Sequence, residues 1–333
     1  KRALKLSAAR RSFSSVSQTT IFDRAVKRLQ RNNIASIETP EEYEYLKDEV
    51  ARRLVDRLED IDREFPIALD LGCGSGHIYK NLSVDDGLGG VKLLLQCDSA
   101  EKLLLRDVEA EQEDTNSLEI KHVIVDEEYL PFPPNHFDLV MSSLSLHWVN
   151  DLPSTFQQVR DCLKADGVFI GAMLGGDSLQ ELRSDELFAR SAFILGDQER
   201  QGGISPHISP FVNIPDVGNL MQGAGFTLCT VDTDYIEVHY PNAFILMEHL
   251  QKMGENNAVL SKGRPATRDS LLAAASIYQA MYANEDGSVP ATFQVIYMIG
   301  WAPHDSQPKP LRRGTAQRSL KELARDTPES ESA

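Results

Sequence analysis

Short apolar runs divide the first half of the chain, and each ends at a glycine or a polar residue. They cover residues 67–71, 91–97, 120–125, 137–144 and 167–173. Runs of this length are typical of strands buried on both faces of a parallel sheet. Two more strands are predicted at 227–240, where apolar and polar residues alternate, and at 291–301, after the turn at 284–290. We therefore expect an α/β fold with one doubly wound, seven-stranded sheet.

Helical patterns fill the intervals between these runs. Ile21 opens a short amphipathic segment. A longer helix is predicted from Thr39 to about Ile61, with Thr39 as its N-cap, Pro40 at its first position and Glu42 completing a capping box. We interpret it as a brace across the first strand. The five residues 163–167 are expected to end the helix before the fifth strand. Further helices are predicted after Ser178 and at 215–224, 242–253 and 268–283, as insertions that cap a ligand site.

The first strand stops at three glycines spaced two apart. Asp70 lies just before Gly72, Gly74 and Gly76, and residues 77–82 can begin a helix. Glycines allow the backbone to turn sharply and to approach a ligand closely, because they lack a Cβ atom. A strand, a glycine turn and a helix N-terminus form the opening of a nucleotide-binding unit.

Acids follow the next two strands as well. Asp98 ends the second strand, 22 residues after Gly76, where a carboxylate can accept hydrogen bonds from a ribose diol. Asp126 and Glu127 end the third strand and lead into an apolar loop, residues 130–132, that could lie against an adenine. Any one of these acids could simply be solvated, but three consecutive strand ends with acids indicate a nucleotide-like cofactor.

Other polar residues are candidates for the chemistry. His147 and Trp148 follow the fourth strand, where His147 could relay a proton and Trp148 could stack on a guanidinium. Both could instead only pack against the following helix. His207 lies in a loop that could cover the pocket or be held by local hydrogen bonds. Carboxylates that could bind an arginine, or merely be solvated, are Asp177, Glu181, Asp232 and Asp234.

Charge and composition narrow the function classes. The 333 residues carry a net charge of −16, which argues against general nucleic-acid binding and favours a cationic substrate or partner. No apolar run approaches the roughly 18 residues of a membrane span. The four cysteines form no CxxC pair, so we expect core residues rather than a zinc site or a disulfide framework. We also predict no metal site of the two-histidine, one-carboxylate type.

The ends of the chain differ from its middle. Residues 1–18 are basic, rich in serine and free of acids, which is typical of a mitochondrial presequence, with a cleavage site expected after Phe13. We divide the remainder into an N-terminal helical segment (19–64), a Rossmann-like core that binds the cofactor (65–176), the cap helices with the last two strands (177–302) and a disordered tail (303–333).

Several of these motifs together resemble a known family. The glycine turn with its preceding acid is similar to the first motif of the class I S-adenosylmethionine (SAM) methyltransferases, in which the acid serves the methionine end of SAM. The later segments GGISPHISPF and MYANEDGSVPAT, with LDLGCGSG, DEEYLPF, FDLVMSSLSLHWVNDLP and LKADGVFIGAM, resemble more narrowly the mitochondrial complex I assembly factor 5 family. The similarity covers roughly residues 20 to 302.

The resemblance implies a function more specific than the fold. It implies an arginine hydroxylase that has a SAM-methyltransferase fold and acts on the PSST-type iron–sulfur subunit of complex I. It also implies peripheral association with the matrix face of the mitochondrial inner membrane, and a small helper assembly factor as a further partner. Two alternatives remain open: a methyltransferase of the biotin-pathway type, acting on a carboxyl group of a carrier protein, and a non-catalytic scaffold that binds SAM.

Overall fold

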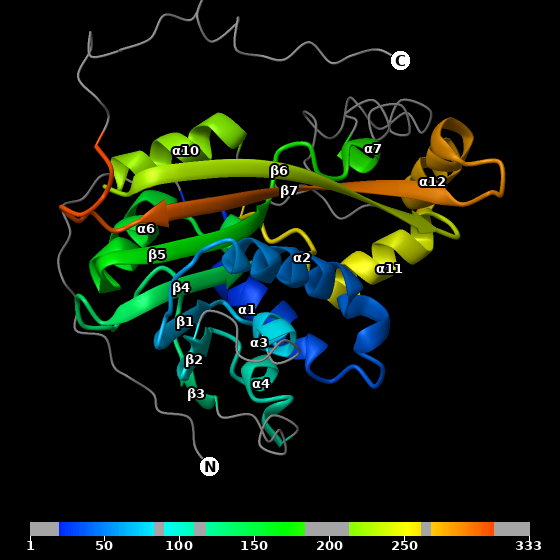
Figure 1. Cartoon of the computed structure of the whole chain (residues 1–333). Helices are drawn as coiled ribbons and strands as arrows, with labels where there is room; N and C mark the ends of the chain where they lie inside the picture. Colours follow the sequence, from blue (N-terminus) through cyan, green and yellow to red (C-terminus); the bar gives the residue numbers. More distant parts are fainter. Residues whose placement is uncertain (1–19, 83–89, 110–117, 184–212, 261–267, 310–333) are drawn as a thin grey trace, which may run out of the picture. The chain divides into compact units, whose positions relative to one another are not determined.

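A computed structural model of the chain describes residues 20–82, 90–109, 118–183, 213–260 and 268–309 (Figure 1). Within these ranges the chain forms one seven-stranded sheet in the order β3-β2-β1-β4-β5-β7-β6. The strands are β1 (Ile67–Leu71), β2 (Leu93–Asp98), β3 (Glu119–Ile124), β4 (Phe137–Ser143), β5 (Leu163–Leu174), β6 (Thr227–Tyr240) and β7 (Val289–Trp301). Strands β1 to β5 are parallel, and β7 runs antiparallel between β5 and β6. The predicted seven-stranded α/β fold is confirmed.

Helices connect the strands. They are α1 (Arg24–Ile34), α2 (Glu41–Glu59), α3 (His77–Leu82), α4 (Glu101–Leu104), the 3-10 turn η2 (Leu146–Trp148), α6 (Leu152–Cys162), α7 (Gln180–Arg183), α10 (Ile214–Gly223), α11 (Ala243–Met253) and α12 (Arg268–Tyr282). The helix predicted after Ser178 is described only as α7, and the loop around His207 lies outside the described residues.

Two local predictions were wrong. The capping box at Thr39 does not form, because α2 begins one residue later than the pattern required, with Pro40 at the N-cap and no side-chain cap bond. Residues 163–167 do not end a helix either. Helix α6 ends at Cys162, and Leu163 is already extended and paired with Phe137 of β4. Pairing with a neighbouring strand outweighs the local helical pattern there.

Alternating side chains of the central strands build two cores, one on each face of the sheet. Ala68, Leu139 and Ile170 belong to a core that α2, α3, α11 and α12 cover. Leu69 and Phe169 point to the opposite core, which α6 and α10 cover. Figure 1 shows α6 and α10 beside the β5–β7–β6 part of the sheet and α2 across its centre. Burial on both faces explains why these strands read as continuous apolar runs.

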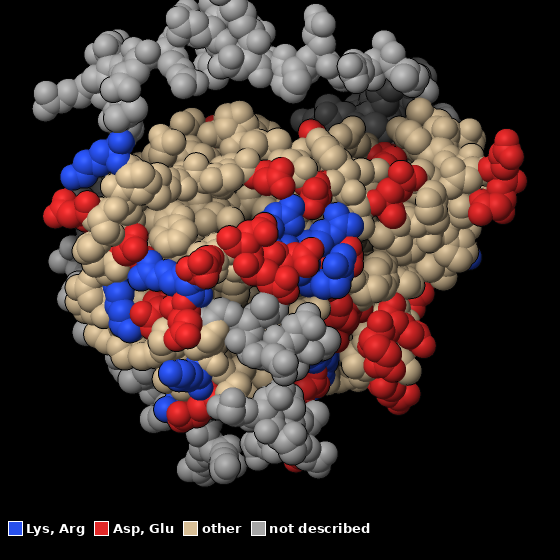
Figure 2. Space-filling model, viewed as in Figure 1, with Lys and Arg blue, Asp and Glu red and all other residues tan. Residues whose placement is uncertain are grey.

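Strand β6 forms one edge of the sheet, and its charges meet those of α2. Arg57 of α2 contacts both Asp232 and Asp234 at 2.9 Å, and Arg53 lies 3.4 Å from Asp234. Figure 2 shows a mixed band of acidic and basic side chains across the part of the molecule where Figure 1 draws α2. The two aspartates considered for substrate binding are therefore paired within the chain itself.

In the described part of the chain, no helix combines the length and the hydropathy that a membrane crossing requires. The chain divides into two units, residues 1–303 and 304–333. All the elements that build the site below belong to the first unit.

Candidate functional site

A cavity lies at the carboxyl ends of β1 and β4, where ligands bind in open α/β sheets. Its free volume is only about 20 Å³. The predicted residues Asp70, Gly72 and Gly74 line one part of it. Trp148 and Glu255 line another part, and Lys27, Arg31 and Lys47 of helices α1 and α2 also face it. Helix α2 is therefore more than the brace that its sequence pattern predicted.

The glycine turn has the tight geometry that its sequence predicts. Gly72, Gly74 and Gly76 all have positive φ angles of 63° to 81°, which favour glycine because a Cβ atom would approach the backbone too closely. A Cβ atom on Gly72 would also overlap the side chain of Ser145. One on Gly74 would meet no atom closer than 3.8 Å. The turn thus needs glycine at position 72 for two reasons and at position 74 for one.

This difference gives a paired prediction. Gly74→Ala is expected to lower the free energy of unfolding by about 1–2 kcal/mol, the cost of an alanine in the left-handed region. Gly72→Ala should cost clearly more, because Ser145 must also leave its bonds to Arg31 and Glu127. Urea unfolding monitored by circular dichroism would compare the two variants. Equal losses would mean that Ser145 yields freely.

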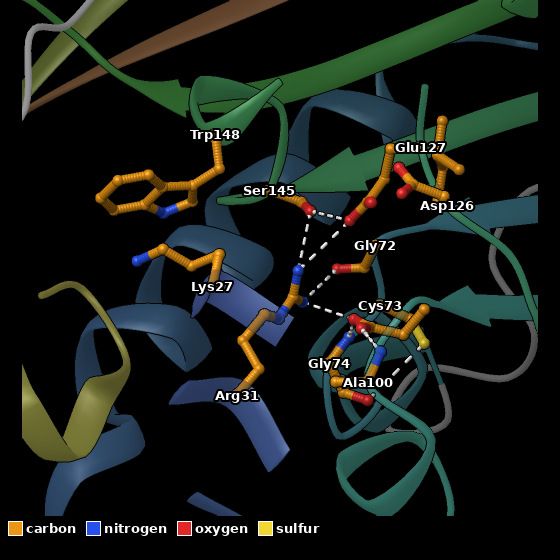
Figure 3. A network of polar contacts seen from close by, with 12 residues as sticks. Lys27, Arg31, Gly72, Cys73, Gly74, Ala100, Asp126, Glu127, Ser145 and Trp148 are labelled. Carbon is orange, nitrogen blue, oxygen red and sulfur yellow. Dashed lines mark hydrogen bonds and ion pairs between the residues drawn. The ribbon is translucent and has the colours of Figure 1, made fainter. Parts of the chain in front are cut away.

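Arg31 of α1 joins the acids of two strand ends (Figure 3). Its guanidinium contacts Asp98 at 2.5 Å and Glu127 at 3.2 Å, and it donates to the carbonyl of Gly72 at 3.2 Å and to the hydroxyl of Ser145 at 3.1 Å. Both carboxylates are fully buried. Asp98 also accepts hydrogen bonds from the backbone N–H groups of Gly74 and Ala100.

The two buried acids have opposite pKa shifts. Burial raises the pKa of Asp98, and the charge of Arg31 offsets this effect only in part. Burial also acts to raise the pKa of Glu127, but the charges of Arg24 and Arg31 outweigh it and hold that pKa below its usual value. Arg24 contacts Glu127 and also Asp126, at 2.9 Å. Asp126, partly exposed, lies at the outer side of this network.

His147 and Trp148 share one carboxylate oxygen of Glu255. His147 Nε2 and Trp148 Nε1 each lie 3.0 Å from Glu255 Oε2. All three residues are largely buried. Burial acts to raise the pKa of Glu255, but its interaction with His147, which includes a hydrogen bond, and the charges of Lys27 and Lys47 outweigh burial, so that the pKa falls to about 2. Glu255 had no place in the sequence prediction, yet it holds both predicted residues in position.

The pKa of Glu255 predicts acid sensitivity. Because its folded pKa of about 2 is below the ordinary value of 4.5, its stabilising contribution is present above pH 4.5 and is lost as the pH falls toward 2. A shift of this size corresponds to about 3 kcal/mol. Urea unfolding at a series of pH values should show that, between pH 4.5 and 2, the native protein loses about 3 kcal/mol more stability than Glu255→Gln does. Identical pH profiles would contradict the assignment.

The remaining predicted site residues lie elsewhere or cannot be placed. Asp177 accepts a hydrogen bond from the side chain of Gln294 at 3.1 Å, and Glu181 accepts one from Thr292 Oγ1 at 2.5 Å. Both partners belong to β7, and neither acid lines the cavity at the glycine turn. His207 lies outside the described residues.

No metal-binding group was found among the described residues. One His-x-Asp spacing does occur, at His136 and Asp138. Asp138, however, lies near the start of β4, at the opposite end from the cavity, where it contacts Lys164 at 2.9 Å. Within the described ranges, no three His, Cys, Asp or Glu residues gather so that they could hold a metal ion. All four cysteines are free thiols, and three of them are buried.

The residues at the strand ends fit SAM. The glycine turn allows a cofactor to approach the backbone closely, because no Cβ atom is in the way. Asp98 presents a buried carboxylate that already accepts N–H donors from Arg31, as it would accept the hydroxyls of a ribose. Asp70 lines the cavity, and the resemblance assigns this acid to the methionine end of SAM. The predicted contact of Asp98 with a ribose would therefore require Arg31 to move away from this carboxylate.

Sequence reasoning missed the contribution of α1. The buried residues of α1 are Lys27, Arg31 and Ile34. The buried face of this helix therefore contains two basic residues at positions where apolar residues are usual. The i, i+4 spacing of Lys27 and Arg31 was the available signal, since it places both on one face of a helix. The partner of that face, a row of acids at strand ends, was already predicted.

Comparisons with known proteins agree with this geometry. A methyltransferase domain family matches residues 69–171. The protein named "Arginine-hydroxylase NDUFAF5, mitochondrial" of Rattus norvegicus is 49% identical over 305 residues, which cover 92% of this chain and 84% of the relative. A malonyl-[acyl-carrier protein] O-methyltransferase of Methylovorus is 28% identical over 271 residues, 78% of this chain and 82% of that protein.

Among solved structures, a candidate methyltransferase from Bacillus halodurans superposes with a TM-score of 0.51 at 14% identity and covers 76% of this chain and 99% of that one. This likeness shows the fold alone. The rat relative shows more, since nearly half of its aligned residues are identical along almost the whole chain. The chain belongs to the NDUFAF5 arginine-hydroxylase family and has a class I SAM-methyltransferase fold.

Proposed function

We propose that this chain is a mitochondrial protein-arginine hydroxylase that binds SAM at the glycine turn. The observation that carries the proposal is its near 50% identity to a relative named as a mitochondrial arginine hydroxylase. The site is compatible with a cationic substrate, because the indole of Trp148 and the carboxylate of Glu255 line the same cavity as Asp70. Aromatic faces and carboxylates are the groups that bind a guanidinium in proteins.

The substrate that we propose is an arginine of the PSST-type iron–sulfur subunit of complex I, modified during early assembly at the matrix face of the inner membrane. A small helper assembly factor would be a second partner. The motifs that distinguish this family from generic methyltransferases support this choice, as does the acidic balance of the chain. The residues of the chain itself would bind and orient the arginine and exclude water, while His147 could hold a proton near it.

Mass spectrometry would test the proposed function. Peptides of the PSST-type subunit would be compared between cells that contain the protein and cells that lack it. A gain of one oxygen atom on one arginine, present only when the protein is present, is the expected result. No change in mass, with complex I assembly still failing, would overturn both enzymatic functions for this substrate and leave a scaffold.

A second candidate function is methyl transfer. The similarity to a malonyl-carrier-protein methyltransferase and the methyltransferase domain at residues 69–171 favour it. Methyl transfer needs only an in-line approach to the sulfonium methyl group in a dry pocket. The same experiment separates the two functions, because a methyl transfer would add one methylene group to the peptide instead of one oxygen atom.

A further inference from the structure

A buried cation lies against the indole ring of Trp148. Lys27 Nζ is 3.1 Å from the ring centroid, and it donates hydrogen bonds to the carbonyl oxygens of Gly254 at 2.8 Å and of Asn256 at 2.9 Å. Lys27 is only 2% exposed. Figure 3 shows its side chain extended beside the indole, apart from the guanidinium of Arg31. We call the indole face, these two carbonyls and the Glu255 carboxylate the cation cage.

The indole, Gly254 and Glu255 of the cation cage are held by contacts that do not involve Lys27. Gly254 ends α11 with a φ of 80°, and the N–H of Glu255 donates to the carbonyl of Leu250 at 2.9 Å, as in a Schellman cap. Trp148 is fixed by its bond to Glu255 and by an edge contact with Phe22 at 5.3 Å. A different cation would therefore meet the same walls.

The side chain of Lys27 has properties that allow it to leave the cation cage. Lysine carries its charge on a flexible four-carbon stem. Burial lowers the pKa of Lys27 to about 7; the carboxylate of Glu255 opposes this shift, and the charges of Arg31, Lys47 and Arg24 add to it. Near neutral pH the side chain can thus lose the charge that the cage holds. The cage also opens into the cavity that Asp70 and Gly72 line, so a ligand there would lie beside the cofactor.

We propose that the cation cage is the subsite for the guanidinium of the substrate arginine and that Lys27 is its internal occupant in the absence of substrate. A planar guanidinium can stack on the indole while its edge donates to the two carbonyls, and Glu255 supplies the negative charge. Two side chains of helix α1 then occupy the positions of ligand groups. Lys27 takes the place of the substrate's cation, and Arg31 takes the place of the ribose hydroxyls. The identity of the cation rests on the proposed function.

Binding of N-acetyl-L-arginine amide to the full chain tests this site, with and without SAM. In a Trp301→Phe background Trp148 is the only tryptophan, so its fluorescence reports on the cage. The probe should change the emission of Trp148, whereas the neutral analogue N-acetyl-L-citrulline amide should not. The Lys27→Ala variant should bind the probe about tenfold more tightly than the protein that retains Lys27, because the cage of the variant has no internal cation. Arg28→Ala, exposed on the same helix, is the matched control.

Each outcome decides the matter. Circular dichroism would first show whether Lys27→Ala is folded. If the folded variant binds the probe no better than Arg28→Ala does, Lys27 is not the internal occupant of the cage. If Lys27→Ala does not fold, the test is the Trp148 emission of the protein that retains Lys27. Equal changes in this emission with the arginine and citrulline probes would overturn the proposed guanidinium subsite. Tighter binding of N-acetyl-L-lysine amide than of the arginine probe would overturn the guanidinium assignment. Probe binding without any oxygen added to a substrate peptide would refute the proposed function and leave the cation site standing.

Discussion

Replacing Arg31 by alanine is expected to lower the free energy of unfolding of the cofactor-free protein by about 3–5 kcal/mol, the usual cost of removing one partner of a buried ion pair. Asp98 and Glu127 are both fully buried and both contact this guanidinium. Glu127 would keep Arg24 and Ser145, but Asp98 would lose the cation that faces it. Urea unfolding at pH 7 without SAM would measure the loss.

The control is again Arg28→Ala, three residues earlier on α1 and exposed, which should change the stability by less than about 0.5 kcal/mol. SAM should stabilise Arg31→Ala more than it stabilises the native chain, since the ribose hydroxyls would then reach Asp98 without displacing an arginine. If SAM stabilised both proteins equally, Arg31 would not occupy the ribose position.

Asp98→Asn is expected to weaken SAM binding by about 100-fold, since hydrogen bonds to a charged group contribute about 1.5–3 kcal/mol each. Asparagine preserves the shape of aspartate but offers a single acceptor oxygen. In the native chain both oxygens of Asp98 already accept backbone N–H groups, from Gly74 and Ala100. One of these donors would face the asparagine NH₂ group, so the turn would also lose its cofactor-binding shape. Isothermal titration with SAM would measure the affinity.

The matched control for Asp98→Asn is Asp138→Asn. Asp138 accepts the backbone N–H of Ile67 at 3.1 Å and contacts Lys164 at the opposite end of the parallel strands. Its replacement should lower stability and leave SAM affinity unchanged. Comparable losses of affinity in the two variants would show that general destabilisation, and not the loss of a ribose contact, explains the result for Asp98.

The fold was predictable because the strands are short and buried on both faces. Continuous apolar runs located β1 and β4 almost to the residue, and alternation located β6. The order of the strands and the antiparallel direction of β7 were not predicted. Local sequence does not specify which strands become neighbours, because that depends on packing between distant segments.

The candidate site was predictable on the cofactor side and not on the opposite side. Glycines and acids at strand ends carry a spacing signal, and the structure brings Asp70, Gly72 and Gly74 together at one cavity. Lys27 and Glu255 lie 228 positions apart in the sequence and meet only after α1 packs against the segment that follows α11. Nothing near either residue indicates the other, so a single sequence gives no means to pair them.

The acidic residues of β6 have a consequence beyond their pairing with α2. In the described part of the sheet β6 pairs only with β7, so the backbone groups along its other side have no strand partner among the described residues. Such a side is a template on which a strand of another molecule can add. Asp232, Asp234 and Glu237 lie along this strand, and a second copy aligned there would bring like charges together. Asp232 and Asp234, which attach α2 to the sheet, should therefore together with Glu237 also oppose self-association into fibres.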